Sequence, residues 1–366
     1  MIGPSFAAVH RRLRRGTESG LFAARHFRRN AIISVMKKEF GSLSTHRAYL
    51  GKPALAGSVA PFPMAPAKVF AAQVAGLTKR LKAISCCDVV IGLSGGLDST
   101  LALLVSYAAF ERLALNKRGI HVYTLPGFAT SSRTKNNAAL LCEGLGLTLE
   151  TIPIAKACRQ HFKDIGHDGK TPDLTYENAQ ARMRTLILMD KANMVGGIVL
   201  GTGDLSEIAL GWCTYNGDHM SMFAVNNGVP KTIVRKVCAW WASAVGKSKA
   251  AKAVRDIIAT PVSPELKKGQ VTEEVIGPYE LHDFFLWNFI VNEMGPKALQ
   301  RAAEEYFDGC FTTDVIAKTL VIFLHRFFTQ AFKRNCQPDG IRVFPFELSL
   351  RGWWIPSDLG VVKLRG

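Results

Sequence analysis

Apolar residues between positions 66 and 201 follow two spacings in alternation. From Val74 to Ile84 they recur at helical spacing, which predicts an amphipathic helix after Pro66. Residues 88–93 then form a short apolar run, as a strand buried on both faces does. The alternation continues along the chain: we expect helices over 97–115, 132–145 and 176–195, and strands over 120–126, 147–154 and 197–201.

Strands that alternate with helices at this pitch are typical of βαβ units with right-handed crossovers. We therefore expect an α/β fold, a doubly wound parallel sheet with flanking helices. Sheets of this kind bind ligands beyond the carboxyl ends of their strands. The residues directly after positions 93, 125 and 201 are the places where the chemistry is expected.

The first sixty residues differ from the rest of the chain. They show no sustained hydrophobic period, and residues 1–50 alone carry a net charge of +8, with arginine clusters at 11–15 and 28–29. We interpret residues 1–60 as a basic N-terminal extension that is poorly ordered or a remnant of a larger domain, and residues 61–366 as one domain. A transit peptide, which is also rich in arginine and poor in acids, is the alternative.

Composition narrows the class of protein. Of the 366 residues, 48% are hydrophobic and 20% are charged, which is typical of globular domains and excludes disorder for most of the chain. No apolar stretch approaches the roughly 20 residues of a membrane span, so no membrane association is expected. Eight scattered cysteines without a CxxC pair predict reduced thiols and a cytoplasmic protein. The net charge of +17 suits an enzyme of anionic substrates, and nucleic acid is not the expected partner.

The segment Ser94-Gly95-Gly96-Leu97-Asp98-Ser99-Thr100 joins the first predicted strand to the next helix. Two glycines allow a tight turn in which successive N–H groups converge on an anion. The N-terminus of the following helix adds positive potential and free donors, and the hydroxyl groups add further donors. This loop is predicted to bind phosphate. It is not a Walker A loop, because the chain contains no GxxxxGK[ST] sequence.

Two other interpretations of the loop stay open at this point. Residues 92–96 match GxSxG, the nucleophile elbow of a hydrolase. An elbow requires a later histidine, for which His282 and His325 are candidates, and an HGGG-like oxyanion segment, which the sequence lacks. Asp98 has no role in that scheme. The second interpretation is a structural glycine-rich turn that binds nothing.

The sequence Ser-Gly-Gly-Leu-Asp-Ser resembles the pyrophosphate loop of the N-type ATP pyrophosphatases, a superfamily that includes NAD synthetase, GMP synthetase, asparagine synthetase and several tRNA-modifying enzymes. Later segments distinguish among these enzymes. They resemble the synthetase half of the long, glutamine-dependent bacterial NAD synthetases over residues 176–184, 201–212, 229–232, 276–285 and 332–334. The resemblance covers roughly residues 61–366, in order. It implies a Rossmann-like fold of the adenine nucleotide alpha hydrolase-like type.

The resemblance also implies a reaction. In NAD synthetases, ATP adenylates the nicotinate carboxylate of deamido-NAD and pyrophosphate leaves. Ammonia then attacks the acyl-adenylate, which gives NAD and AMP. The chain is therefore expected to be a ligase that forms a C–N amide bond, with ATP, deamido-NAD and ammonia as substrates and Mg²⁺ as cofactor.

Residue roles follow from the same resemblance. Asp98 and Glu207 would be catalytic and would bind Mg²⁺, which favours one or two carboxylates together with phosphate oxygens. Asn178 and Arg182 would share one helix face toward deamido-NAD, being four residues apart. The expected ATP contacts are Gly92, Leu93, Ser94, Gly95, Gly96, Leu97, Asp98, Ser99, Arg133, Thr202, Lys231 and Ser263. The expected deamido-NAD contacts are Asn178, Arg182, Trp212, Tyr215, Asp218, Lys333 and Arg334.

The sequence departs from the family in three places. The glutaminase half, with its Glu–Lys–Cys triad, has no counterpart in residues 1–60, which contain no cysteine. Leu350 and Trp353 stand where the family usually has Pro and Asp, and the segment 263–270 is shortened. We expect this chain to use ammonia, with a separate glutaminase as a possible partner, and to form a homo-oligomer. The basic N-terminal extension would then be what remains of a lost glutaminase domain.

Two rival functions are kept. One is another ATP pyrophosphatase, such as a tRNA-modifying enzyme, which the positive charge favours and which would need an appended RNA-binding module. The other is a truncated, inactive synthetase whose N-terminus binds nucleic acid through phosphate contacts.

Overall fold

Five parallel strands form one sheet in the computed structural model, which describes residues 59–260, 266, 271–349 and 352. The strands are β1 (Val89–Gly92), β2 (Ile120–Thr124), β3 (Leu149–Thr151), β4 (Ile198–Gly201) and β5 (Phe223–Ala224). They lie in the order β3-β2-β1-β4-β5, and each neighbouring pair is parallel. The chain thus moves outward from β1 in both directions, which confirms the doubly wound sheet.

The central strand explains why the apolar runs become strands. Val89, Val90 and Ile91 have no exposed surface, and β1 is hydrogen-bonded to β2 on one side and to β4 on the other. A strand covered on both faces needs apolar side chains on both, so it shows no alternation. β3, at the sheet edge, is shorter than the predicted 147–154, and its residues Glu150 and Thr151 are exposed.

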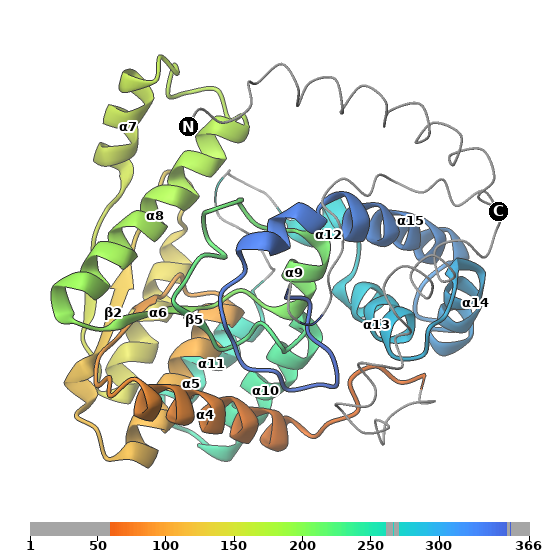
Figure 1. Cartoon of the computed structure of the whole chain (residues 1–366), viewed down its shortest axis with the longest axis horizontal. Helices are drawn as coiled ribbons and strands as arrows, with labels where there is room; N and C mark the ends of the chain where they lie inside the picture. The colour runs from red at the N-terminus through yellow and green to blue at the C-terminus, as the bar shows by residue number, and fades with distance from the viewer. Residues whose placement is uncertain (1–58, 261–265, 267–270, 350–351, 353–366) are drawn as a thin grey trace, which may run out of the picture. The chain divides into compact units, whose positions relative to one another are not determined.

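Helices cover both faces of the sheet (Figure 1). On one side lie α7 (Ala155–Asp164) and α8 (Leu174–Val195), of which α8 packs on β1 and β4. On the other side α5 contacts β1 and is itself covered by α4 and α10, while α11 packs on α6. The bounds of this second group are α4 (Pro66–Ala83), α5 (Leu97–Leu113), α6 (Ser132–Leu145), α10 (Lys231–Ala244) and α11 (Lys249–Ile258).

A second group of helices follows in the C-terminal part of the chain. Aromatic side chains hold α13 and α15 together, for example Phe285 against Phe323 with ring centroids 5.8 Å apart. The sequence pattern had not predicted these elements. The bounds of this group are α12 (Thr272–Ile276), α13 (Tyr279–Ile290), α14 (Pro296–Tyr306) and α15 (Thr313–Thr329), followed by the 3₁₀ turn η3 (Ala331–Cys336). The short helix α9 (Leu205–Leu210) and the 3₁₀ turn η2 (Lys117–Gly119) lie earlier in the chain.

The beginning and the end of the described chain meet at one edge of this fold. Phe62 is buried against Trp287 and Phe344, with ring centroids 5.1 and 4.9 Å away. Next to this cluster, β5 continues into the C-terminal segment: Ala224 donates to the carbonyl of Asp339, and Ala224 accepts from the N–H of Ile341. Residues 339–341 therefore act as a further parallel pairing partner at the β5 edge.

Two expectations concern segments at the limits of this description. No helix in the described part of the chain is both long enough and apolar enough to cross a membrane. Residues 1–58 of the predicted basic extension 1–60 lie outside the described residues, as do Ser263, Leu350 and Trp353, so the predicted domain boundary stays a prediction.

Candidate active site

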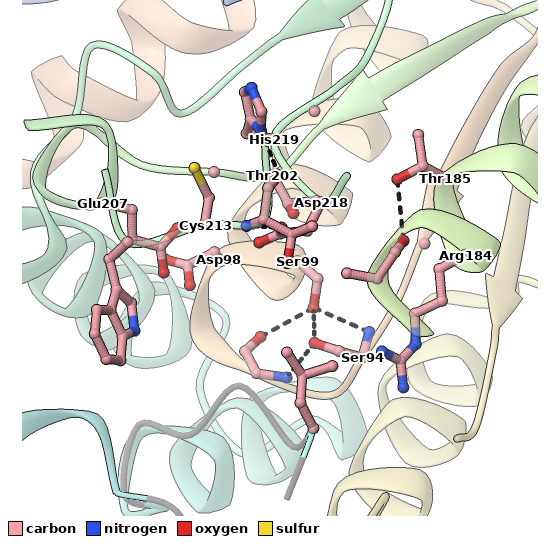
Figure 2. Close-up of a pocket in the computed structure, with 18 of the residues that line it drawn as sticks. Ser94, Asp98, Ser99, Arg184, Thr185, Thr202, Glu207, Cys213, Asp218 and His219 are labelled. Carbon is pink, nitrogen blue, oxygen red and sulfur yellow. Dashed lines mark hydrogen bonds between the residues drawn. The ribbon is translucent and has the colours of Figure 1, made fainter. Parts of the chain in front are cut away.

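A cavity of about 820 Å³ lies at the carboxyl ends of β1, β2 and β4 (Figure 2). Residues at the end of each strand contribute to its wall, over 92–99, 124–125 and 201–203. Other parts of the wall come from α8 and from residues 211–220, which we call the cavity loop. The cavity is thus at the edge of the sheet where the sequence predicted a ligand site.

The glycine-rich segment forms the floor at the end of β1. Gly95 adopts φ +88°, and a Cβ there would lie 2.2 Å from the backbone oxygen of Thr134, so only glycine fits. The hydroxyl groups of Ser94 and Ser99 lie 3.0 Å apart, and the Ser94 hydroxyl also accepts from the Gly96 N–H. These contacts fix the loop ahead of α5, whose N-terminus lines the cavity and offers its free donors to an anion.

The two histidines nominated for the nucleophile-elbow interpretation of this loop do not line the cavity. His282 is buried, hydrogen-bonds to the backbone oxygen of Ile276, and has its pKa lowered to about 4 by burial. His325 is exposed on α15. Neither of these two nominated histidines belongs to the cavity wall, as far as the described residues define it, so Ser94 has neither candidate as its base.

Three carboxylates from two elements meet at one end of the cavity. Asp98 comes from the first turn of α5, Asp204 is the N-cap of α9 and accepts from the Glu207 N–H, and Glu207 lies in α9. One ligand oxygen from each lies within 4.8 Å of the others. We call these residues the acidic cluster. The ammonium of Lys231 lies among them, 2.6 Å from Asp98, 2.8 Å from Asp204 and 2.9 Å from Glu207.

The pKa values in the acidic cluster show how these charges depend on one another. Burial raises the pKa of Glu207 to about 7 and that of Asp204 well above its usual value, although the Lys231 charge opposes both shifts. Burial alone would lower the pKa of Lys231, but the three carboxylates outweigh it and raise that pKa well above its usual value. The lysine is therefore firmly protonated, and it does not fully neutralise the acids around it.

The residues present fit a divalent cation. Three carboxylates against one ammonium leave an excess of negative charge, and carboxylate oxygens are the ligands that Mg²⁺ prefers. In the described part of the chain, no donor hydrogen-bonds to the buried Oδ1 of Asp98. A buried carboxylate oxygen without a donor is costly, and a metal ion next to it would remove that cost.

A second layer of polar groups holds the acidic cluster in place. The buried carboxylate of Asp283, on α13, accepts hydrogen bonds from the Ser206 hydroxyl and from the N–H and hydroxyl of Thr232. Burial raises the pKa of Asp283 to about 6, against the effect of these hydrogen bonds. The Ser206 hydroxyl also accepts from the Lys231 N–H at 2.8 Å. Asp283 thereby ties α9, which carries Glu207, to α10, which begins at Lys231.

The cavity loop forms the other end of the cavity, and most of the hydrogen bonds that hold it involve its own backbone. Asp218 accepts from the Thr214 N–H at 2.7 Å, and the Thr214 hydroxyl donates to Asn178 on α8 at 2.8 Å. Lys333 donates to the backbone oxygens of Gly211 and Cys213, at 3.0 and 2.7 Å. Burial lowers the pKa of Lys333, in contrast to that of Lys231.

Most of the residues named from the sequence line this one cavity. Asp98 and Glu207 lie side by side at one end, as Figure 2 shows, and each is 21% exposed. Lys231 lies behind them, with 2% of its side chain exposed. The expected residues that line the cavity are Gly92, Leu93, Ser94, Gly95, Gly96, Leu97, Asp98, Ser99, Asn178, Thr202, Glu207, Trp212, Tyr215, Asp218 and Lys333.

Three arginines proposed as ligand contacts lie elsewhere. Arg133 is exposed and pairs with Asp256 at 2.7 Å. Arg182 lines a smaller neighbouring cavity of about 410 Å³ and donates to the Tyr215 backbone oxygen. Arg334 is buried and donates to the backbone oxygens of Ala209 and Phe327. The hydrogen bonds of Arg334 favour a supporting role over the predicted substrate contact, which stays a prediction.

Sequence reasoning missed several residues of the site. Asp204 belongs to the acidic cluster, and its place three residues before Glu207 is the spacing of a capping box, which could have indicated it. Arg184 lines the cavity and donates to the Leu125 backbone oxygen. Arg326 lies 4.9 Å from the centre of the Trp212 ring. Arg184 and Arg326 lie on helix faces whose orientation toward the cavity depends on the fold, so the sequence alone does not indicate them.

Comparison with known proteins agrees with this geometry. The NAD synthase family model matches residues 69–305. A glutamine-dependent NAD(+) synthetase from Mycobacterium leprae is 38% identical over 351 residues, a match that covers 85% of this chain and 52% of that protein. The chain thus spans about half the length of the curated relatives it matches.

Solved structures share the fold. A glutamine-dependent NAD(+) synthetase from Cytophaga hutchinsonii matches 79% of this chain and 53% of its own, with a TM-score of 0.62 and 17% identity. An NH3-dependent NAD synthetase from Campylobacter jejuni matches 74% of this chain and 96% of its own, with a TM-score of 0.52 and 20% identity. The family match includes the glycine-rich loop, the acidic cluster and the cavity loop, and it shows that this chain belongs to the NAD synthase family.

Proposed function

We propose that this chain catalyses the ATP-dependent amidation of deamido-NAD to NAD, with ammonia as the nitrogen donor and with release of AMP and pyrophosphate. One observation carries the proposal. A single cavity of an NAD synthase family member joins a glycine-rich loop at a helix N-terminus to a buried acidic cluster. The first feature suits the phosphates of a nucleotide, and the second suits the metal that accompanies them.

The ATP end of the proposed site is the floor of the cavity. Backbone N–H groups of residues 92–99 bind the phosphates, and Thr202 lies at the end of β4 beside them. Asp98 and Glu207, joined by Asp204, hold Mg²⁺, which when bound offsets the negative charge of the phosphates. Lys231 supplies a further positive charge on the same side.

The deamido-NAD end is formed by α8, the cavity loop and η3. Asn178, Trp212, Tyr215 and Asp218 line this part of the cavity, and Lys333 provides the charge for the dinucleotide phosphates. Arg182 acts through its hydrogen bonds to the Tyr215 backbone, which hold the loop against α8. Two anionic substrates thus approach each other between fixed positive groups, and the carboxylate of one lies next to the phosphates of the other.

The environment of the cysteines bears on which nitrogen donor this chain can use. Hydrolysis of glutamine usually requires a thiolate. Burial raises the pKa values of Cys142, Cys158, Cys213, Cys238 and Cys336, which disfavours their thiolates at neutral pH. Cys336 also lies 3.1 Å from the Nε2 of His219, so it is the thiol to test first if glutamine is used. Ammonia needs no such nucleophile, because it attacks an acyl-adenylate that is already activated. We therefore propose free ammonia, or ammonia delivered by a separate glutaminase, as the nitrogen source. We also propose that the reaction takes place in the cytoplasm.

The test is a reaction with ATP, Mg²⁺, deamido-NAD and ammonium, in which NAD and AMP are measured by chromatography. Equal amounts of NAD and AMP are expected, with more product toward alkaline pH because unprotonated ammonia is the nucleophile. A parallel reaction with glutamine in ammonium-free buffer should give no NAD. Steady formation of NAD and glutamate from glutamine would contradict the ammonia proposal, and AMP without NAD would contradict the amidation.

A further inference from the structure

The ammonium of Lys231 occupies the position that the acidic cluster offers to a metal ion. It contacts Asp98, Asp204 and Glu207 at 2.6–2.9 Å. A magnesium ion bound by the same oxygens would lie about 2.1 Å from each of them. An ammonium and a dication cannot share so small a space, because their charges repel and their radii overlap.

The surroundings of Lys231 let its ammonium leave while its backbone stays. The backbone N–H is fixed to the Ser206 hydroxyl at 2.8 Å, at the start of α10. The four-carbon stem above it has rotatable bonds, and the carboxylates of Asp98 and Glu207 that it contacts both face the cavity. The path from the acidic cluster to the phosphate loop is therefore short, since Asp98 belongs to both.

We propose that Lys231 is a stand-in for the metal: its ammonium fills the acidic cluster until a metal–nucleotide complex arrives, and it then turns to the nucleotide phosphates. The proposal rests on the proposed use of ATP with a divalent cation. Its consequence is an order of binding. The free metal competes poorly against an internal cation that is always present, whereas the nucleotide brings the metal together with an alternative anionic partner for the lysine.

The experiment measures Mn²⁺ binding to the protein by electron paramagnetic resonance, without nucleotide and with α,β-methylene-ATP. Wild-type protein without nucleotide should bind Mn²⁺ weakly, and the Lys231→Met variant should bind it at least about 10²-fold more tightly, because a unit charge at this distance is removed. With α,β-methylene-ATP the difference should shrink strongly or reverse.

The matched control is Lys333→Met. It removes the same charge from the wall of the neighbouring cavity, but Lys333 contacts backbone oxygens and not carboxylates. A gain in Mn²⁺ affinity as large as that of Lys231→Met would show a general effect of charge and would overturn the proposal. A second test variant, Lys231→Gln, keeps a hydrogen-bond donor among the carboxylates and serves if the methionine variant fails to fold.

Wild-type protein alone can also overturn the proposal. Tight Mn²⁺ binding at the acidic cluster without nucleotide, abolished by Asp98→Asn, would mean that the Lys231 ammonium does not occupy the metal position. This measurement uses no deamido-NAD and no ammonia. Failure to make NAD together with the Lys231 effect on Mn²⁺ binding would contradict the proposed function but not the role of Lys231 in the acidic cluster. Normal formation of NAD without the Lys231 effect would contradict that role but not the proposed function.

Discussion

The two ends of the cavity hold their lysines in opposite ways. Lys231 lies among three carboxylates, and these charges raise its pKa. Lys333 donates to two backbone oxygens, and burial lowers its pKa. A carbonyl is a neutral partner that an anionic substrate can replace at small cost, whereas Lys231 can leave its carboxylates only when another cation takes its place. The acidic end is therefore suited to exchange one cation for another, and the cavity loop end is suited to accept an anion.

The largest effect is expected at the acidic end. Asp98→Asn or Glu207→Gln removes a proposed metal ligand, so the rate of pyrophosphate release from ATP and deamido-NAD should fall by ~10²–10³ or more. Circular dichroism should show an intact fold. Asp190→Asn, at an exposed carboxylate on α8, is the control and should keep the wild-type rate. Wild-type release by either site variant would remove it from the proposed catalytic set.

Arg334→Ala separates a role of Arg334 in substrate binding from a role in stabilising the fold. The change removes the hydrogen bonds that Arg334 donates to the backbone oxygens of Ala209 and Phe327 in the protein interior. The free energy of unfolding should fall by about 2–4 kcal/mol, measured by urea denaturation. The KM values for both substrates should stay near wild type at a temperature where the variant is folded. A selective rise in the KM for deamido-NAD would instead support the substrate contact that the sequence predicts for Arg334.

Lys333→Ala tests the loop end directly. We expect weaker binding of deamido-NAD by about 1.5–3 kcal/mol, the usual range for a charged hydrogen bond, and a smaller change for ATP. Arg182→Ala should act in the same direction and less strongly, because Arg182 reaches the cavity through Tyr215. Isothermal titration with each substrate separates the two cases. Equal losses for ATP and deamido-NAD would place Lys333 with the structural residues.

An effect that depends on pH is expected in α13, the helix that carries Asp283. Burial lowers the pKa of His282 to about 4 in the folded protein, against about 6.5 when unfolded. The unfolded chain then binds more protons in this interval, so stability falls as pH falls from about 6.5 to 4. His282→Gln removes this titrating group and with it this part of the pH dependence of stability. Its stability relative to wild type should therefore improve by about 2 kcal/mol between pH 7.5 and 4.5 in urea titrations. A constant difference across this range would contradict the assignment.

The sheet was predictable because its signals are local. The strand β1 and the helices α6 and α8 follow from apolar runs and helical spacing that only a few neighbouring residues create. The helices α13 to α15 were not predicted, since their stability comes from aromatic contacts such as Phe285 with Phe323, between residues distant in the chain. A periodicity argument does not see such contacts.

The site was predictable where a motif carries the chemistry. The glycine-rich loop with Asp98, and Glu207 after β4, could be named because strand ends meet at one edge of a parallel sheet. The ion pairs of Lys231 with all three acids could not, because they depend on how α10 is placed against α5 and α9. The burial of Arg334 could not be predicted for the same reason. Lys333 and Arg334 are adjacent basic residues that the sequence does not distinguish, and only packing places Lys333 in the cavity wall and Arg334 in the interior.

The pairing of β5 with residues 339–341 has a consequence for how the chain folds during synthesis. The ribosome delivers Ala224 more than one hundred residues before its partner Gly340. Until then, the backbone of Ala224 at the sheet edge lacks this partner, and an open strand edge is a template for pairing with other chains. A chain cut before residue 339 should therefore aggregate when expressed, even though it contains every residue of the acidic cluster.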